Sequence, residues 1–540
     1  MALTPARADN TPECNENLSF GSNTLECGVN ARATGENSTA VGSNSQAGGD
    51  NSTAVGEDAS ATGEGSVVVG RNAQAQAFGI AIGGDFDDAD TSGARANSAW
   101  SIAIGADAQA SGGGGIAFGI SSTVTGFSAV AIGRSARADG ASAIAAGVNS
   151  SASGAGSLAI GEAASSSNTE TIALGASSQA TGFFAIALGG SSSASGASGT
   201  AVGFEATASG QSASAFGTGA IASGTNAISL GAFSESGSSS IAIGSDGLDG
   251  GSEGAQAAAL FSIAIGADSL ANQDNATALG YTAQGTGESA TALGINARAR
   301  GSRTLAAGAS ALAEGANSVA LGSSAFAEDE GAVAIGNGAE TSGAIGAISL
   351  GERTEALAQQ AMAIGSNAFA SANSAIALGV SADAGGNSAV ALGRNSQASG
   401  ANTLSIGVET TASGISAIAI GGDGPVDPDD EGSEATADYA TAIGPDAKAT
   451  GQLSYALGAI SSASGVNSTA LGSFANAAGL SSLALGSGAD ATANFSSAIG
   501  TGSAASHAAS FALGAGASTT RINQIVLGQD GSGFGATAPV

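Results

Sequence analysis

Short apolar segments that end in glycine recur along almost the whole chain. One copy is Ser101–Gly105, with the sequence SIAIG, and others are SLAIG at 157–161 and SLALG at 482–486. In each copy an aliphatic or aromatic residue stands directly before the glycine, and the residue before that is mostly alanine. Alternation of this kind over about five residues, closed by glycine, predicts a short β-strand followed by a tight turn.

These copies lie about 14 residues apart, and a second short segment fills the first half of each repeat. It reads A-x-A-x-G, as in ARATG at 31–35 and AQASG at 108–112. We call the glycine that closes the S-x-A-φ-G segment the anchor glycine and count repeat positions from the residue after it. Two short strands per repeat, with no helix-length segment between them, predict an all-β fold, a parallel β-solenoid or β-roll with one coil per repeat.

The repeat phase defines the domain organisation. Roughly 35 anchor glycines occur, and we expect a continuous β-roll over 28–528, an irregular N-terminal cap over 1–27 and a C-terminal tail over 529–540. Three insertions interrupt the 14-residue step. They lie near 84–100, 245–261 and 422–439, always just after an anchor glycine, and each ends close to an aromatic residue: Trp100, Phe261 or Tyr439. Extra residues at one phase of a solenoid are expected to form loops on one side of it.

The two predicted strands differ in polarity. The first strand alternates alanine with polar residues such as Gln109, so one of its faces contacts water. The second strand is apolar or small on both faces, and a strand that is dry on both faces must be covered on both. We expect Ile102 and Ile104 to fill the space on one side of this strand, and Ala103 to set how closely the surface packed on the other side approaches. Ile418, Ala419 and Ile420 form a matching strand. One cover is the opposite wall of the coil and the other is a second chain, which predicts a homo-oligomer along the array. We therefore expect Ala103→Asp to disturb assembly and Gln109→Asp to be silent.

Composition narrows the class of protein further. Glycine is abundant, at 88 of 540 residues, but only 6 prolines are present, which excludes collagen. The net charge is −31 and Lys448 is the single lysine, so nucleic acid is a poor partner. No apolar run is long enough for a transmembrane helix, so we expect no direct membrane insertion by this chain. Residues 1–10 lack the apolar segment of a complete signal peptide.

Candidate catalytic chemistry is sparse. His507 is the only histidine and stands in the slot that elsewhere holds the mid-repeat glycine, so we interpret it as a turn residue. No Ser–His–Asp or Cys–His arrangement is present, and the Gly-x-Ser strings follow from composition. We therefore predict no catalytic residues, no cofactor and no enzyme activity.

Two features support more specific hypotheses. The first and third insertions are acidic, and Ca²⁺ binds carboxylate and carbonyl oxygens; the alternative is a solvated loop, since neither matches an EF-hand. The calcium candidates are Asp85, Asp87, Asp88, Asp427, Asp429 and Asp430. The two cysteines, Cys14 and Cys27, are separated by nearly one repeat. In a stacked coil this spacing brings them within disulfide reach in an oxidising compartment, and the alternative is a pair of reduced thiols.

The pattern A-x-A-x-G-x-x-S-x-A-I-G over about 14 residues resembles the YadA-like head domain of trimeric autotransporter adhesins, and RINQIVLG at 521–528 resembles the segment that ends such heads. The resemblance covers nearly the whole chain. It implies a left-handed parallel β-roll, three identical chains in an intertwined or side-by-side homotrimer, and display outside the cell at a bacterial outer membrane. It also implies attachment to matrix proteins, cells or abiotic surfaces, as in virulence or biofilm formation. The heptad stalk and C-terminal membrane anchor of a full-length family member are not found in this sequence.

Two other solenoid classes and one other role are alternatives for this repeat. The hexapeptide phase of left-handed acyltransferases conflicts with a repeat of two seven-residue halves. Ice binding requires ranks of outward threonine, whereas the outward slots of the first strand vary, as in Arg32, Gln109 and Lys448. The second functional hypothesis is a structural or self-associating surface fibre or spacer, including a phage-type fibre, with no specific ligand.

Overall fold

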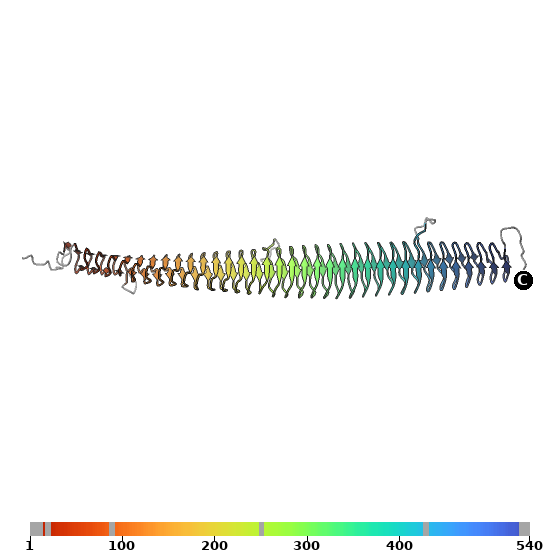
Figure 1. Ribbon diagram of the computed structural model, residues 1–540, viewed down its shortest axis with the longest axis horizontal. Helices are drawn as coiled ribbons and strands as arrows, with labels where there is room; N and C mark the ends of the chain where they lie inside the picture. Colours follow the sequence, from red (N-terminus) through yellow and green to blue (C-terminus); the bar gives the residue numbers. More distant parts are fainter. Residues whose placement is uncertain (1–13, 17–22, 86–91, 248–252, 425–430, 529–540) are drawn as a thin grey trace, which may run out of the picture. The chain divides into compact units, whose positions relative to one another are not determined.

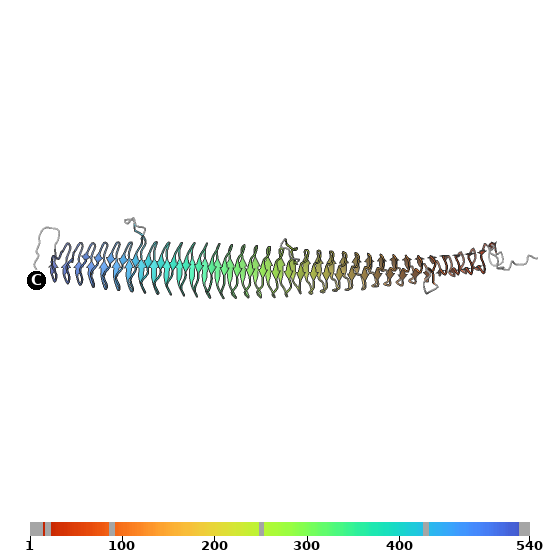
Figure 2. The ribbon, with the colours of Figure 1, turned by 180° about the vertical axis from the view of Figure 1, so that it is seen from behind.

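The computed structural model describes residues 14–16, 23–85, 92–247, 253–424 and 431–528. The chain divides into two compact units, Met1–Asp274 and Asn275–Val540. Within the described ranges every regular element is a β-strand. The coils of each unit follow one another in a single stack, as Figures 1 and 2 show from opposite sides. The fold class is therefore a parallel β-solenoid with coils of about 14 residues, as the repeat predicts.

Each regular coil contains one two-residue strand and one three-residue strand. In the coil that ends at Gly119 these are β13 (Gln109–Ala110) and β14 (Ile116–Phe118), and the preceding three-residue strand is β12 (Ile102–Ile104). The same rule gives the bounds in the other regular coils. The three-residue strand occupies positions 11 to 13, directly before the anchor glycine, and the two-residue strand occupies positions 4 and 5.

Strands of the same kind pair in parallel from coil to coil and keep the repeat register. Ile102, Ala103 and Ile104 of β12 face Ile116, Ala117 and Phe118 of β14. In the first unit the three-residue strands β2 to β34 form one such ladder and the two-residue strands β3 to β35 form another. The second unit repeats this arrangement with β36 to β68 and β37 to β65. Corresponding side chains therefore form columns, with neighbours separated by about 4.8 Å.

The register survives the insertions. β10 (Ile80–Ile82) pairs with β12 across the first insertion, and β56 (Ile418–Ile420) pairs with β58 (Thr441–Ile443) across the third. Each insertion therefore leaves the coil at the turn after the anchor glycine and returns without disturbing either ladder.

Two tight turns close each coil, and both contain a residue in the left-handed region. These residues stand at positions 2 and 9, as for Asn44 and Asn51, whose φ angles are 57° and 59°. The anchor glycine has a different requirement. Gly119 has a φ of 138°, and a β-carbon there would lie 2.4 Å from the carbonyl oxygen of Gly133 in the next coil. Glycine is thus required at the anchor for its backbone conformation and for close coil stacking.

Alanine fills the coil interior. Ala103, Ala110 and Ala117 are fully buried, and almost all of the buried apolar residues in the described part of the chain are alanines. The serine of the S-x-A-φ-G segment is also buried. Ser101 donates a hydrogen bond from Oγ to the carbonyl oxygen of Ser98 at 2.6 Å, which satisfies the hydroxyl inside the turn. Other serines in this slot, Ser157, Ser318, Ser454, Ser468 and Ser482, have a buried Oγ with no hydrogen-bond partner among the described residues, so a local partner is common in this slot but not general.

Serine replaces the interior alanine in the three-residue strands at Ser229, Ser349 and Ser405, and each of these three is matched by a hydroxyl across the anchor turn. Ser229 lies 2.6 Å from Ser234, Oγ to Oγ, and Ser349 donates to Oγ1 of Thr354 at 2.6 Å. The two partners are separated by five residues, across the anchor turn. A buried hydroxyl without a partner is costly, so the two polar residues occur together.

Candidate functional surfaces

The three-residue strand directs its middle residue inward and its two outer residues outward. Ala103 is fully buried, whereas Ile102 and Ile104 remain partly exposed on the single chain. The same pattern occurs in β56, where Ala419 is buried between Ile418 and Ile420. Our assignment of alanine to the approach between chains is therefore wrong. Alanine sets the distance between the two walls of one coil, because these walls are too close for larger side chains, and the branched residues face out.

These outward residues form a surface that we call the outer row, defined as positions 11 and 13 of each coil. From β4 (Thr39–Val41) onward, position 13 is always Val, Ile, Leu, Phe or Ala. Several of these side chains are strongly exposed, including Leu174 at 45%, Leu230 at 46% and Leu293 at 44%. Monomeric proteins rarely leave a long contiguous apolar surface open to water, so within each unit the outer row has the character of an interface.

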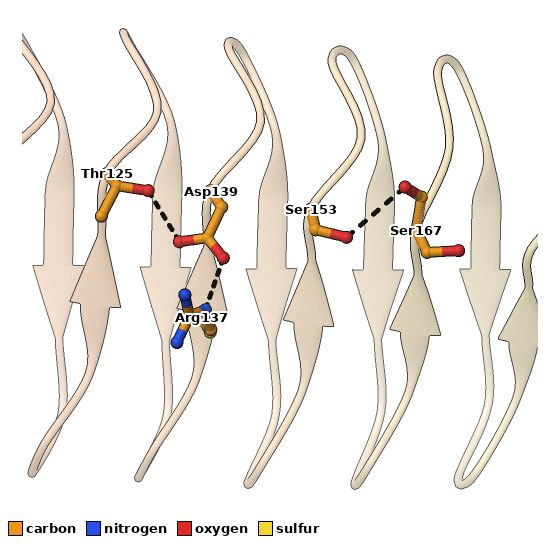
Figure 3. A network of polar contacts seen from close by, with 5 residues as sticks. All are labelled: Thr125, Arg137, Asp139, Ser153 and Ser167. Carbon is orange, nitrogen blue, oxygen red and sulfur yellow. Dashed lines mark hydrogen bonds and ion pairs between the residues drawn. The ribbon is translucent and has the colours of Figure 1, made fainter.

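The outward face of the two-residue strands is polar. Figure 3 shows part of it, where Thr125 donates to Oδ1 of Asp139 at 2.7 Å and Arg137 pairs with the same carboxylate. In the next coils Ser153 donates to the carbonyl oxygen of Ser167 at 3.4 Å. The Thr125–Asp139 and Ser153–Ser167 contacts link neighbouring coils at equivalent positions, whereas Arg137 and Asp139 belong to the same coil. This face therefore has a water-compatible surface of its own, as the sequence predicts.

All three insertions attach to the preceding coil through equivalent backbone hydrogen bonds. The first of these bonds runs from the amide of Asp85, Asp246 or Asp423 to a carbonyl oxygen of that coil at 3.2–3.3 Å. The second comes from the glycine that ends the insertion, Gly93, Gly254 or Gly432, at 3.0–3.3 Å. A β-carbon on any of these glycines would lie 2.3–2.6 Å from a carbonyl oxygen of the same coil. The insertions thus share one attachment geometry.

An aspartate in the following coil completes two of these attachments. Oδ1 of Asp268 accepts a hydrogen bond from the amide of Gly247 at 2.8 Å, and Asp446 does the same for Gly424 at 2.9 Å. Asp107 occupies the equivalent place after the first insertion. Sequence reasoning missed these residues, although a signal exists: aspartate stands two residues after the anchor glycine that follows every insertion.

The aromatic residues that we associated with the insertions lie elsewhere on the coil. Trp100, Phe261 and Tyr439 each occupy position 9, in the turn opposite the one that carries the insertion, with φ between 56° and 62°. Trp100 stacks on Phe78 of the preceding coil with ring centroids 4.3 Å apart. These aromatic residues are therefore not part of the insertion loops.

Of the calcium candidates only Asp85 falls within the described residues. Its carboxylate is almost buried and accepts hydrogen bonds from Arg71 at 3.3 Å and Asn72 at 3.4 Å. Asp87, Asp88, Asp427, Asp429 and Asp430 lie outside the described residues. Among the described residues no group of three acidic, histidine or cysteine side chains is arranged to hold a metal ion.

A shallow acidic cleft of about 420 Å³ lies beside the third insertion. It is lined by Asn395, Gln397, Glu409, Thr411, Glu431, Glu434 and Thr436. Lys448 lies 3.2 Å from the carboxylate of Glu431 and 3.6 Å from that of Glu434. Partial burial raises the pKa of Glu434, and the hydrogen bond with Glu431 adds to this shift, against the opposing charge of Lys448.

The N-terminal cysteines meet in a different way from the one we expected. β1 (Cys14–Glu16) pairs antiparallel with β2 (Leu25–Cys27), and this register places Cys14 opposite Cys27. The Cα atoms are 4.1 Å apart and a disulfide joins the two residues. The contact therefore arises from an antiparallel pair at the start of the stack and not from parallel stacking of two coils.

The single histidine lies in a turn. His507 accepts a hydrogen bond at its backbone oxygen from Oγ of Ser510, and its ring nitrogen Nδ1 lies 3.2 Å from Oγ of Ser506. No helix long and apolar enough to cross a membrane occurs in the described ranges.

Stacked coils with an alanine interior, a polar face and an apolar outer row define this chain as a repetitive parallel β-solenoid. The sequence profile of the YadA head domain repeat matches it repeatedly, from residue 28 to residue 503. The matched segments are 28–45, 47–73, 101–122, 125–150, 152–178, 180–206, 208–234, 255–283, 286–311, 313–339, 343–368, 370–396, 398–423 and, overlapping one another, 431–503. They cover well over half of the chain, and the chain therefore belongs to the YadA head family. No curated protein matches it.

Proposed function

We propose that this chain is the head of a trimeric autotransporter adhesin. In this role it is a non-enzymatic protein displayed outside a bacterial cell, where it attaches the cell to matrix, other cells or abiotic surfaces. The family match supports an adhesin-like surface protein. The observation that carries the proposal further is the outer row, which presents an apolar side chain at position 13 of every coil from β4 onward.

Three copies of this chain, coiled with the left-handed sense of the family, would cover their outer rows by packing them around a common axis. Leucines at position 13 such as Leu174 are a little under half exposed on the single chain, so covering one contributes about 1 kcal/mol. The contribution repeats in every coil, and the total over the array is therefore large. The polar faces of the two-residue strands stay in water and become the outside of the assembly.

Attachment in this account is multivalent. A trimer offers three copies of every outward position, so weak individual contacts combine into strong attachment. No deep pocket is required, which agrees with an interior filled by alanine.

The proposal is tested by adhesion of the purified chain. Fluorescent beads coated with the chain are passed over matrix-coated glass, cultured cells and bare polystyrene, and retention under flow is compared with beads coated with albumin. We expect selective retention on at least one of these surfaces, and lower retention for a variant that does not self-associate. An assembled chain that is retained on none of them would favour the alternative, a structural fibre or spacer without a ligand.

A further inference from the structure

A second shallow cleft lies on the polar face of the second unit. It has a volume of about 310 Å³ and is lined by Asn296, Arg298, Ser310 and Leu312. Arg298 begins β39 (Arg298–Ala299) and Leu312 begins β41 (Leu312–Ala313), so the two side chains stand at position 4 of consecutive coils. Asn296 and Ser310 stand at position 2 of the same coils.

The polar groups of this cleft are hydrogen-bond donors. Oδ1 of Asn296 accepts a hydrogen bond from Oγ1 of Thr282 in the preceding coil, which leaves the Nδ2 amide group as the free end of this side chain. The guanidinium group of Arg298 is exposed and forms no ion pair with any residue that the structure describes. The hydroxyl of Ser310 can donate as well. A guanidinium group beside an amide and a hydroxyl that can both donate favours an anion.

The next arginine on the same face is neutralised by an ion pair, in contrast to Arg298. Arg300 lies two residues further along the same face, and its Nη1 is 2.5 Å from Oε1 of Glu314. The carboxylate is therefore engaged with Arg300, and the positive charge of Arg298 remains available to a ligand.

Arginine at position 4 has other arrangements elsewhere in the chain. Arg137 is paired with Asp139 on its own strand, and Arg95 donates to Oγ of Ser92 at 2.5 Å. In the coil of Arg32 the residue at position 2 is Asn30. Its Nδ2 group donates a hydrogen bond to Oδ1 of Asn44 at 3.2 Å, so this amide group, unlike that of Asn296, is engaged within the chain. Within the described part of the chain, the combination of an open cleft, an unpaired arginine and a free amide donor is found at Arg298.

We propose that the Asn296–Leu312 cleft binds the oxyanion of an acidic saccharide, either a carboxylate or a sulfate ester. Arg298 pairs with the oxyanion, and Asn296 and Ser310 donate to it or to adjacent hydroxyl groups. Leu312 offers an apolar wall to the C–H face of the sugar ring. The net charge of −31 opposes the approach of anions in general, but screening at physiological ionic strength limits that repulsion to about 8 Å.

The acidic cleft beside the third insertion indicates that the side chains at positions 2 and 4 determine the charge of this polar face. It uses the same repeat positions, with Asn395 and Glu409 at position 2 and Gln397 and Thr411 at position 4. The backbone trough is thus equivalent in the two places, and the residues at positions 2 and 4 determine the sign of its charge. The inference concerns this face alone and does not depend on the proposed function or on self-association.

The test is a titration of the full chain followed by saturation-transfer NMR. The probes are a sulfated uronic-acid disaccharide, an unsulfated disaccharide that carries only a carboxylate, and lactose as the neutral control. We expect millimolar binding of at least one acidic probe, as befits a single shallow contact, and weakening as salt rises. Binding of the sulfated probe alone or of both acidic probes identifies the oxyanion that the cleft prefers.

Variants separate this cleft from general charge effects. Arg298→Gln should lower the affinity about tenfold, because a charge-assisted hydrogen bond is lost. Arg32→Gln removes the same charge at the same repeat position and should leave the affinity unchanged. The proposal is overturned by absent binding, by equal binding of lactose, or by equal loss in the two variants.

Discussion

The side chain of Val124 occupies space that a β-carbon on Gly115 would need. Val124 is one of the few interior residues larger than alanine, and a β-carbon built on Gly115 would lie 2.7 Å from its Cγ1 atom. Most coils have serine or alanine at the position of Gly115. Gly115 and Val124 belong to neighbouring coils on either side of the anchor Gly119, so large and small residues are matched between these coils, which shows how closely the two walls approach.

This relationship predicts a coupled pair of mutations. Gly115→Ala should destabilise the chain by about 1–3 kcal/mol, since the added methyl group overpacks the interior. Val124→Ala restores the usual composition, so in that background Gly115→Ala should cost little. Thermal or urea unfolding of the two single variants and the double variant measures the coupling. Additive effects would show that the two residues do not share space.

The anchor glycines should be far less tolerant than glycines at other positions of the same coil. Gly119→Ala forces a β-carbon to within 2.4 Å of a carbonyl oxygen at a φ of 138°, and we expect a loss of at least about 2 kcal/mol in unfolding free energy. Gly113→Ala is the matched control. Its nearest neighbour is the ring of Phe127 at 3.3 Å, which can move. Similar melting temperatures for the two variants would contradict the stacking argument.

The attachment of the third insertion depends on Asp446. Asp446→Ala removes the acceptor for the buried amide of Gly424, and an unsatisfied buried donor costs about 1–3 kcal/mol. We expect faster hydrogen exchange at Gly424 and its neighbours, with little change in coils distant from the insertion. Asp58→Ala provides the control, because Asp58 occupies the same repeat position in a coil that follows no insertion. Unchanged exchange in Asp446→Ala would show that the insertion is held by its other contacts.

The ionisation of Asp383 lowers the stability of the folded chain, and this effect depends on pH. Its Oδ1 atom is buried with no hydrogen-bond partner among the described residues, and burial raises the pKa of the carboxyl group. The folded state therefore binds this proton more tightly than the unfolded state does. The contribution to stability is favourable below the unfolded pKa of about 3.9 and is lost as the pH rises through the folded pKa.

We therefore expect Asp383→Asn to stabilise the chain at pH 7 by less than about 1 kcal/mol, since the half-exposed group is partly solvated. At pH 3 the advantage should vanish, because the carboxyl group is then largely protonated in both states. Thermal unfolding of both proteins at the two pH values measures the difference. A variant that is equally stabilised at pH 3 would assign the effect to packing and not to ionisation.

The repeat made the fold predictable, because every coil has the same pattern of residues. Position 14 requires glycine, and the alternation around Ala103 and Ala110 places a strand in each half of the coil. The sequence did not reveal which side of the three-residue strand faces inward, because alanine and isoleucine are both apolar. The separation of the two walls decides this, and that separation is a property of the folded coil.

Contacts between coils were the other feature beyond the reach of sequence reasoning. In the sequence, Asp268 and Asp446 look like ordinary turn residues. Their role depends on the backbone amides of Gly247 and Gly424, which the fold places beside their carboxylates. The antiparallel partner of β2 was missed for a related reason: the spacing of Cys14 and Cys27 fits one coil of a parallel stack as well as it fits a hairpin-like pair. The donor cleft at Arg298 depends on which side chains of neighbouring coils are already engaged.

The central claim is that the outer row holds several copies of the chain together. Sedimentation equilibrium of the purified chain tests it most directly, alongside a variant in which Ile104, Ile132, Ile160 and Leu188 are each replaced by Asp. A control variant carries Asp in place of Gln109 and Gln179 on the polar face. We predict a mass of about 150 kDa, three times the 50.0 kDa of one chain, for the wild type and the control, and a lower mass for the outer-row variant. A stably folded wild-type monomer at micromolar concentration would contradict the account.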